Sequence, residues 1–182
     1  MNKPVSPAAV IRSEEHWTNR GDDVRLFLWN KHGGDPSGPA GRILFVHGSS
    51  MASQPTFDLA VPGRPDSSVM DWFAKRGFVC WSVDMEGYGR SDKSRDIPCD
   101  IANGADDLAA ATDYMRRARG VERVMAYGIS SGALREPVHR RRIGAARDRE
   151  IERRLRGHRR AVYEQDRGLA RRRTYGALLP QE

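Results

Sequence analysis

Between residues 14 and 127, short apolar runs alternate with polar segments rich in turn-forming residues. Residues 14–18 and 24–29 read as strands, and the turn chemistry of 19–23 between them predicts an antiparallel hairpin. The later runs 43–46 and 78–83 are apolar without alternation, which is typical of strands that are covered on both faces of a sheet. The pattern therefore predicts a hairpin followed by buried strands.

A first helix is predicted between these two buried runs. Residues 66–68 can cap its N-terminus, and Val69, Met70 and Phe73 then face the core at helical spacing. Gly77 is placed to end the helix in a left-handed conformation.

A second helix is predicted from Asn103 to Gly120, with Asp106 and Asp107 in its first turn. Its core positions recur at helical spacing: Ala105, Leu108, Ala111 or Thr112, and Met115. Residues 121–127, which end in the apolar run 124–127, predict another strand. Because strands alternate with helices, we expect an α/β fold with a mainly parallel sheet that begins with the antiparallel hairpin.

The charge is distributed unevenly along the 182 residues, a length that suits one domain. Residues 1–132 contain 16 Lys and Arg against 17 Asp and Glu, whereas residues 133–182 contain 15 Arg, no Lys and 7 acidic residues. The whole basic excess behind the net charge of +7 therefore follows residue 132. It says nothing about the partners of the globular part.

The chain shows no sequence feature of export or membrane insertion. Residues 1–12 lack the apolar region of a secretion signal, and no apolar run approaches the ~18 residues of a membrane span. The two cysteines, Cys80 and Cys99, form neither a disulfide framework nor a metal-binding spacing. We expect a soluble cytoplasmic protein that has no membrane partner and needs no metal or organic cofactor.

Gly128-Ile129-Ser130-Ser131-Gly132 follows the apolar run 124–127 at a point where a helix could begin. In this context the pattern G-x-S-x-G predicts a nucleophile elbow, in which the serine is held on a sharp turn between a strand and a helix. Side chains at Gly128 and Gly132 would collide with the turn.

With this serine the chain resembles the N-terminal half of an α/β-hydrolase of the AB hydrolase-1 type. Three motifs carry the resemblance in the order of that family: Val46-His47-Gly48-Ser49-Ser50, the segment from Asp84 to Asp92, and the serine turn. The resemblance implies an N-terminal extension at 1–13 and a partial hydrolase domain at 14–132, truncated after the serine turn. Residues 133–182 then form a basic tail outside the family fold.

The resemblance implies a role for each matching residue. Ser130 would be the nucleophile, and the backbone N–H groups of Ser49 and Ser131 would form the oxyanion hole. His47 would be structural and would pack beneath the oxyanion loop. Asp84 would belong to a loop that shapes the site.

In the family order, an acid and then a histidine follow the serine on loops after later strands. The tail contains no run that resembles such a strand, and Arg140-Arg141-Arg142 stands where a core is expected. Asp148 and His158 occur in the required order, but only ten residues separate them. This spacing argues against a working triad of Ser130 with these two residues.

Three interpretations of the tail remain open. The abrupt change to Arg, Ala and Gly resembles the product of a shifted reading frame in GC-rich DNA. A basic arm for nucleic acid is disfavoured because aromatic residues are sparse and seven acidic residues dilute the charge. A helix with Ile151, Leu155, His158 and Val162 on one face would provide an amphipathic surface, although Gly157 interrupts it.

By resemblance, the expected function is hydrolysis of an ester or amide of a small acyl substrate through an acyl-enzyme at Ser130. The alternative is an inactive remnant or a non-enzymatic binding protein with a basic tail, in which Ser130 has no general base. The substrate and the oligomeric state are not encoded in any pattern of this sequence.

Overall fold

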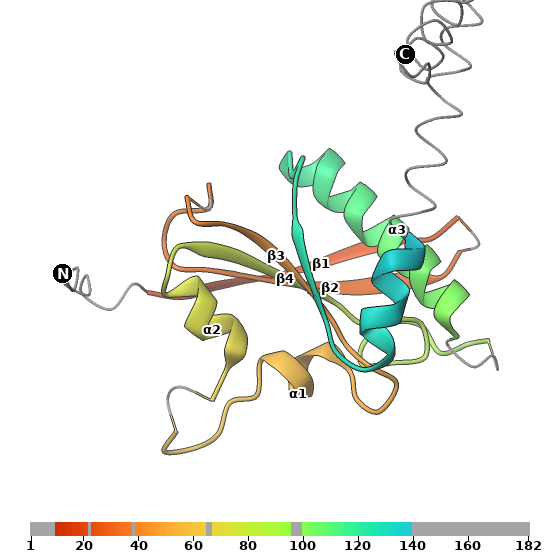
Figure 1. Cartoon of the computed structure of the whole chain (residues 1–182), viewed down its shortest axis with the longest axis horizontal. Coiled ribbons are helices and arrows are strands. Elements are labelled where there is room, and N and C mark those ends of the chain that lie inside the picture. The colour runs from red at the N-terminus through yellow and green to blue at the C-terminus, as the bar shows by residue number, and fades with distance from the viewer. Residues whose placement is uncertain (1–9, 22, 38, 65–66, 96–99, 140–182) are drawn as a thin grey trace, which may run out of the picture. The chain divides into compact units, whose positions relative to one another are not determined.

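The computed structural model describes residues 10–21, 23–37, 39–64, 67–95 and 100–139. Within them, five strands form one sheet in the order β1-β2-β4-β3-β5. Helices lie on both faces of this sheet (Figure 1). The α/β class predicted from the sequence is therefore confirmed.

The predicted hairpin is also confirmed, and its strands are longer than the sequence pattern indicated. β1 (Arg12–Asn19) pairs antiparallel with β2 (Arg25–His32) along their whole length. The turn between them is closed by the Arg20 N–H, which donates to the Val24 carbonyl at 2.8 Å.

The sheet is mixed, because two of its four strand pairings are parallel and two are antiparallel. β2 pairs antiparallel with β4 (Phe78–Val83), and β3 (Gly41–Val46) pairs parallel with both β4 and β5 (Met125–Gly128). β3 and β4 match the predicted buried strands closely. The carboxyl ends of β3, β4 and β5 therefore meet at one edge of the sheet. In α/β folds, ligands bind next to the carboxyl ends of parallel strands.

The two faces of β3 pack against different helices. Leu44 and Val46 belong to a core cluster that includes residues of α3 (Ile101–Arg119). Ile43 and Phe45 belong to a second cluster with residues of α1 (Ser53–Phe57) and α2 (Val69–Ala74). This double burial explains why the run is apolar without alternation. Figure 1 shows α3 on one side of the sheet and α1 and α2 on the other.

α2 begins close to the predicted position. Ser68 is its N-cap and accepts a hydrogen bond from the Asp71 N–H at 3.0 Å. Met70 is fully buried, but Val69 is 39% exposed, so the prediction that it faces the core was wrong. Gly77 has φ +83°, as predicted for the residue that closes the helix.

α3 starts earlier than predicted. Its N-cap is Asp100, whose carboxylate accepts from the Asn103 N–H at 2.7 Å, so the proposed cap at Asn103 was wrong. Both side chains are good helix caps, and the local sequence alone did not distinguish them. The C-terminus is as predicted, since Gly120 is the C-cap with φ +60°. The predicted core face of α3 is buried: Ala105, Leu108, Ala111, Thr112 and Met115.

β5 departs most from the sequence prediction. It covers four residues rather than the predicted run 121–127, and it lies at the edge of the sheet. Met125 and Tyr127 are 51% and 53% exposed. Residues 131–139 then form a helix, so the change of composition at residue 133 falls inside a helix. The short helix α1 had no clear signal in the sequence pattern.

Candidate functional site

Ser130 lies on a sharp turn between β5 and the helix at 131–139. Its φ is +51°, a left-handed conformation that costs a residue with a Cβ roughly 1–2 kcal/mol. The turn is held by the Ile129 N–H, which donates to the Val46 carbonyl at 3.2 Å, and by the Ala133 N–H, which donates to the Ser130 carbonyl at 3.0 Å. The side chain of Ser130 is exposed.

Three glycines allow the chain to pass closely around this turn. A Cβ at Gly132 would lie 2.3 Å from the Val46 carbonyl oxygen, and one at Gly128 would lie 2.7 Å from the backbone of Gly132. A Cβ at Gly48 would lie 2.9 Å from Ser130 Cβ and 3.4 Å from Ser130 Oγ. The loop after β3 therefore reaches the Ser130 side chain, and only glycine leaves room for this approach.

Ser49 and Ser131 also meet at this point. Their hydroxyl oxygens are 2.7 Å apart, although 82 positions separate the residues in the chain. The Ser49 carbonyl accepts a hydrogen bond from the Tyr88 hydroxyl at 2.8 Å. The structure thus brings together Ser130, Ser131 and Ser49, the three residues that the sequence singled out around the serine turn.

The His47 imidazole is fully buried beneath this loop, and both of its nitrogens contact backbone groups. Nε2 accepts from the Met85 N–H at 3.0 Å, and Nδ1 donates to the Gly48 carbonyl at 2.6 Å. Burial lowers the pKa of His47 below the ordinary value of 6.5. A neutral imidazole with both nitrogens in hydrogen bonds supports the loop and is not placed to take a proton from Ser130.

Asp84 follows β4 and is only 2% exposed. Its Oδ1 accepts from the N–H and the hydroxyl of Ser53 at 2.9 and 2.5 Å, and its Oδ2 accepts from the Arg90 N–H at 3.0 Å. A Cβ at Gly89 would overlap this carboxylate at 1.9 Å. Asp84 therefore fixes the path of the loop that follows β4.

Among the described residues, no side chain hydrogen-bonds the Ser130 hydroxyl. Among the histidines with described surroundings, His16 contacts the Tyr114 hydroxyl at 3.0 Å and His139 contacts Thr112 Oγ1 at 3.3 Å. The sequence candidates Asp148 and His158 lie outside the described residues.

Arg135 is a site residue that the sequence analysis missed. It lies one turn after Ser131 in the helix at 131–139 and is fully buried. Its guanidinium donates to the His47 carbonyl at 3.2 Å and lies 3.4 Å from Ser49 Oγ. An arginine within an arginine-rich stretch gave no signal that it would be buried.

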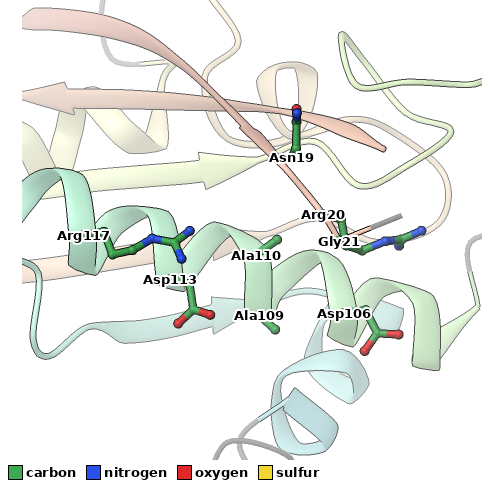
Figure 2. Close-up of a pocket in the computed structure, with 8 residues that line it drawn as sticks. All are labelled: Asn19, Arg20, Gly21, Asp106, Ala109, Ala110, Asp113 and Arg117. Carbon is green, nitrogen blue, oxygen red and sulfur yellow. The ribbon is translucent and has the colours of Figure 1, made fainter. Parts of the chain in front are cut away.

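A separate groove of about 560 Å³ lies between the end of β1 and α3 (Figure 2). Its lining contains no serine, cysteine or histidine: Asn19, Arg20, Gly21, Asp106, Ala109, Ala110, Asp113 and Arg117. The part of the chain that the structure describes holds no group of three or more potential metal ligands. It also contains no helix long and apolar enough to cross a membrane.

No protein-family model matches the sequence, and no curated protein matches it. Solved structures do match. An esterase of Pyrococcus furiosus, Pf2001, is similar over 69% of this chain and 42% of its own, with a TM-score of 0.54 and 20% identity. A predicted CIB-like hydrolase of Thermoplasma acidophilum is similar over 71% and 56%, with a TM-score of 0.51 and 22% identity.

The epoxide hydrolase VrEH1 of Vigna radiata is similar over 70% of this chain and 33% of its own, with a TM-score of 0.50 and 19% identity. These likenesses establish that the matched part of the chain has the α/β-hydrolase fold. The chain spans between about one third and somewhat more than half of the length of these three structures.

Proposed function

We propose that the protein is a serine hydrolase that cleaves an ester or amide bond of a small acyl substrate through an acyl-enzyme at Ser130. One observation carries the proposal: an exposed serine in a left-handed conformation at the start of a helix, with the loop after β3 against its side chain. A strained conformation at an exposed polar residue is typical of functional sites. Because Ser130 is exposed, its hydroxyl is accessible to a substrate.

In the proposed reaction, Ser130 Oγ bonds to the acyl carbon and its proton passes to a general base. The leaving group takes that proton as its bond to the acyl carbon breaks, and water then hydrolyses the acyl-enzyme. The oxyanion that forms in each step accepts hydrogen bonds from the N–H groups of Ser49 and Ser131. The helix dipole at the N-terminus of 131–139 favours the same negative charge.

The proposed reaction needs a general base that takes the proton of Ser130. His47 is committed to backbone hydrogen bonds, and His139 packs on α3, so neither serves Ser130. Asp148 and His158 are the remaining pair in the family order. If they do not reach Ser130, the chain is an inactive relative that keeps the serine and the oxyanion loop, which is the second candidate function.

A fluorophosphonate probe tests the proposal because it bonds covalently to an activated serine. We expect labelling of the full chain at Ser130, located by mass spectrometry of the labelled peptide. Ser130→Ala should abolish labelling, and Ser37→Ala, which changes an exposed serine elsewhere, should not alter it. An unlabelled chain with a cooperative unfolding transition would support the inactive alternative instead.

His158→Gln then tests whether the reactivity of Ser130 depends on His158 or on the turn and the oxyanion hole alone. If His158 is the base, its replacement should slow labelling by roughly 10³-fold, the scale on which triad members contribute. An unchanged labelling rate would show that Ser130 reacts without His158. Labelling would then reflect the turn and the oxyanion hole alone.

A further inference from the structure

We propose that Arg135 is a positioning residue that holds the loop at 47–49 against the start of the helix at 131–139. This inference rests on the proposed function for its catalytic consequence, but its structural part stands independently. None of the described hydrogen bonds of Arg135 involves Ser130. It would act through Ser49, whose N–H is the proposed oxyanion donor.

The contacts of Arg135 bridge two segments that the site requires in register. Arg135 itself lies in the helix that begins at the serine turn, and its guanidinium donates to the His47 carbonyl at 3.2 Å. The guanidinium also lies 3.4 Å from Ser49 Oγ, which is 2.7 Å from Ser131 Oγ. The loop after β3 is thereby tied to the helix both at a carbonyl and at a side chain.

A second segment also restrains Ser49. Its carbonyl accepts from the Tyr88 hydroxyl at 2.8 Å, and the neighbouring His47 is fixed by the Met85 N–H at 3.0 Å. The loop after β4 therefore contacts the carbonyl of Ser49, and Arg135 contacts its side chain. An oxyanion donor is effective only when its direction is set before the charge develops, which restraint at both the carbonyl and the side chain of Ser49 would achieve.

The cost of burying Arg135 supports a specific role. A charged side chain removed from water is costly unless it is hydrogen-bonded, and Arg135 is 0% exposed. α3 makes room for it with Gly104, because a Cβ at that position would lie 2.4 Å from Arg135 Cδ and 2.5 Å from Nε. Gly104 in the interior of α3 lowers helix stability by about 1 kcal/mol relative to alanine.

The first test measures the rate at which the fluorophosphonate probe labels Ser130. Arg135→Met keeps an unbranched apolar stem and removes the charge and the donors, and we expect labelling to slow at least tenfold. Arg135→Lys should restore part of the rate. Arg117→Met, which changes an exposed arginine on α3, should leave the rate unchanged. Urea unfolding of each variant shows which ones remain folded.

A double-mutant cycle separates positioning from general loss of stability. Gly104→Ala improves helix propensity but displaces Arg135, so it should slow labelling alone. In the Arg135→Ala background the clash is absent, and Gly104→Ala should then have no further effect on the rate. Independent, additive effects of the two substitutions would overturn the proposal.

The second test needs no activity and therefore separates this inference from the proposed function. Hydrogen exchange should be at least tenfold faster in Arg135→Met than in the unsubstituted chain at the Met85 amide, which donates to His47 Nε2, and at the Ile129 amide, which donates to the Val46 carbonyl. Exchange in β1 and β2 should be unchanged. Unchanged exchange at these amides would overturn the positioning role. Faster exchange in a chain that the probe never labels would support the positioning role and refute the proposed function.

Discussion

The ends of β4 and β5 occupy equivalent places in the fold but have opposite surroundings. Both strands pair parallel with β3, so Asp84 and Ser130 follow strands at the same edge of the sheet. Asp84 is buried, and three donors satisfy its carboxylate. Ser130 is exposed and strained. The comparison shows that hydrogen-bond saturation, and not position alone, distinguishes a structural strand-end residue from a candidate reactive one.

We expect the largest difference in unfolding free energy between two single variants in which Asp84 or Ser130 is replaced by alanine. Asp84→Ala leaves the N–H groups of Ser53 and Arg90 without their acceptor, and we expect it to lower the free energy of unfolding by about 3 kcal/mol. Ser130→Ala removes an exposed hydroxyl and should change it by less than about 0.5 kcal/mol. Urea denaturation measures both values. Equal losses would break the distinction between the two strand ends.

Sequence patterns predicted the elements better than their burial. Cys80 in β4 and Met125 in β5 both lie opposite Ile43 in the sheet, and both belong to apolar runs. Cys80 is fully buried, whereas Met125 is 51% exposed. Their burial differs because β4 has a neighbouring strand on each side and β5 is at the edge. This difference is a property of the assembled sheet, which a run of apolar residues does not encode.

The candidate site divides in the same way. The glycines at 128 and 132 indicated a tight turn, because the need for glycine there arises from close local approach. The role of Arg135 depends on Gly104, which lies 31 positions earlier in the chain and on another helix. The general base likewise depends on tertiary placement. Local geometry was therefore predictable from the residues themselves, and the approach of Ser49 to Ser131 was predictable only through the family resemblance. The contact between Arg135 and the loop after β3 was not predictable in either way.

The stability that Asp107 contributes to the loop after β4 should depend on pH. Asp107 in α3 accepts from the Glu86 N–H at 2.9 Å and thereby anchors the loop after β4. Burial raises the pKa of Asp107 from 3.8 to about 6. The folded chain thus takes up this proton before the unfolded chain does, so the contribution of Asp107 to stability increases as the pH falls through about 6 towards 4 and is lost as the pH rises.

Asp107→Asn removes this titration. Between pH 7 and pH 5 the unsubstituted chain should gain about 1 kcal/mol of unfolding free energy relative to this variant. Asp113→Asn changes an exposed aspartate of the same helix and serves as the matched control in urea titrations at the two pH values. If Asp107→Asn gained as much unfolding free energy between pH 7 and pH 5 as Asp113→Asn does, the assignment to Asp107 would be contradicted.

The smallest expected change in stability lies at the edge strand β5. Met125→Lys places a charge on a half-exposed position and should alter the unfolding free energy by less than about 0.5 kcal/mol. It should nevertheless reduce self-association, because unpaired, apolar edge strands are templates for pairing with another chain and a lysine opposes such pairing. Light scattering over a range of protein concentrations measures this effect.

Gln54→Lys adds the same charge to an exposed position on α1, outside the edge strand, and separates a local effect from a general increase in net charge. We expect it to leave self-association unchanged. If both lysine variants reduced association equally, repulsion between whole molecules would account for the result. If only Met125→Lys reduced it, the contact would be the edge of β5 that has no partner strand within the described residues. The two variants differ in where the charge lies and not in how much charge is added.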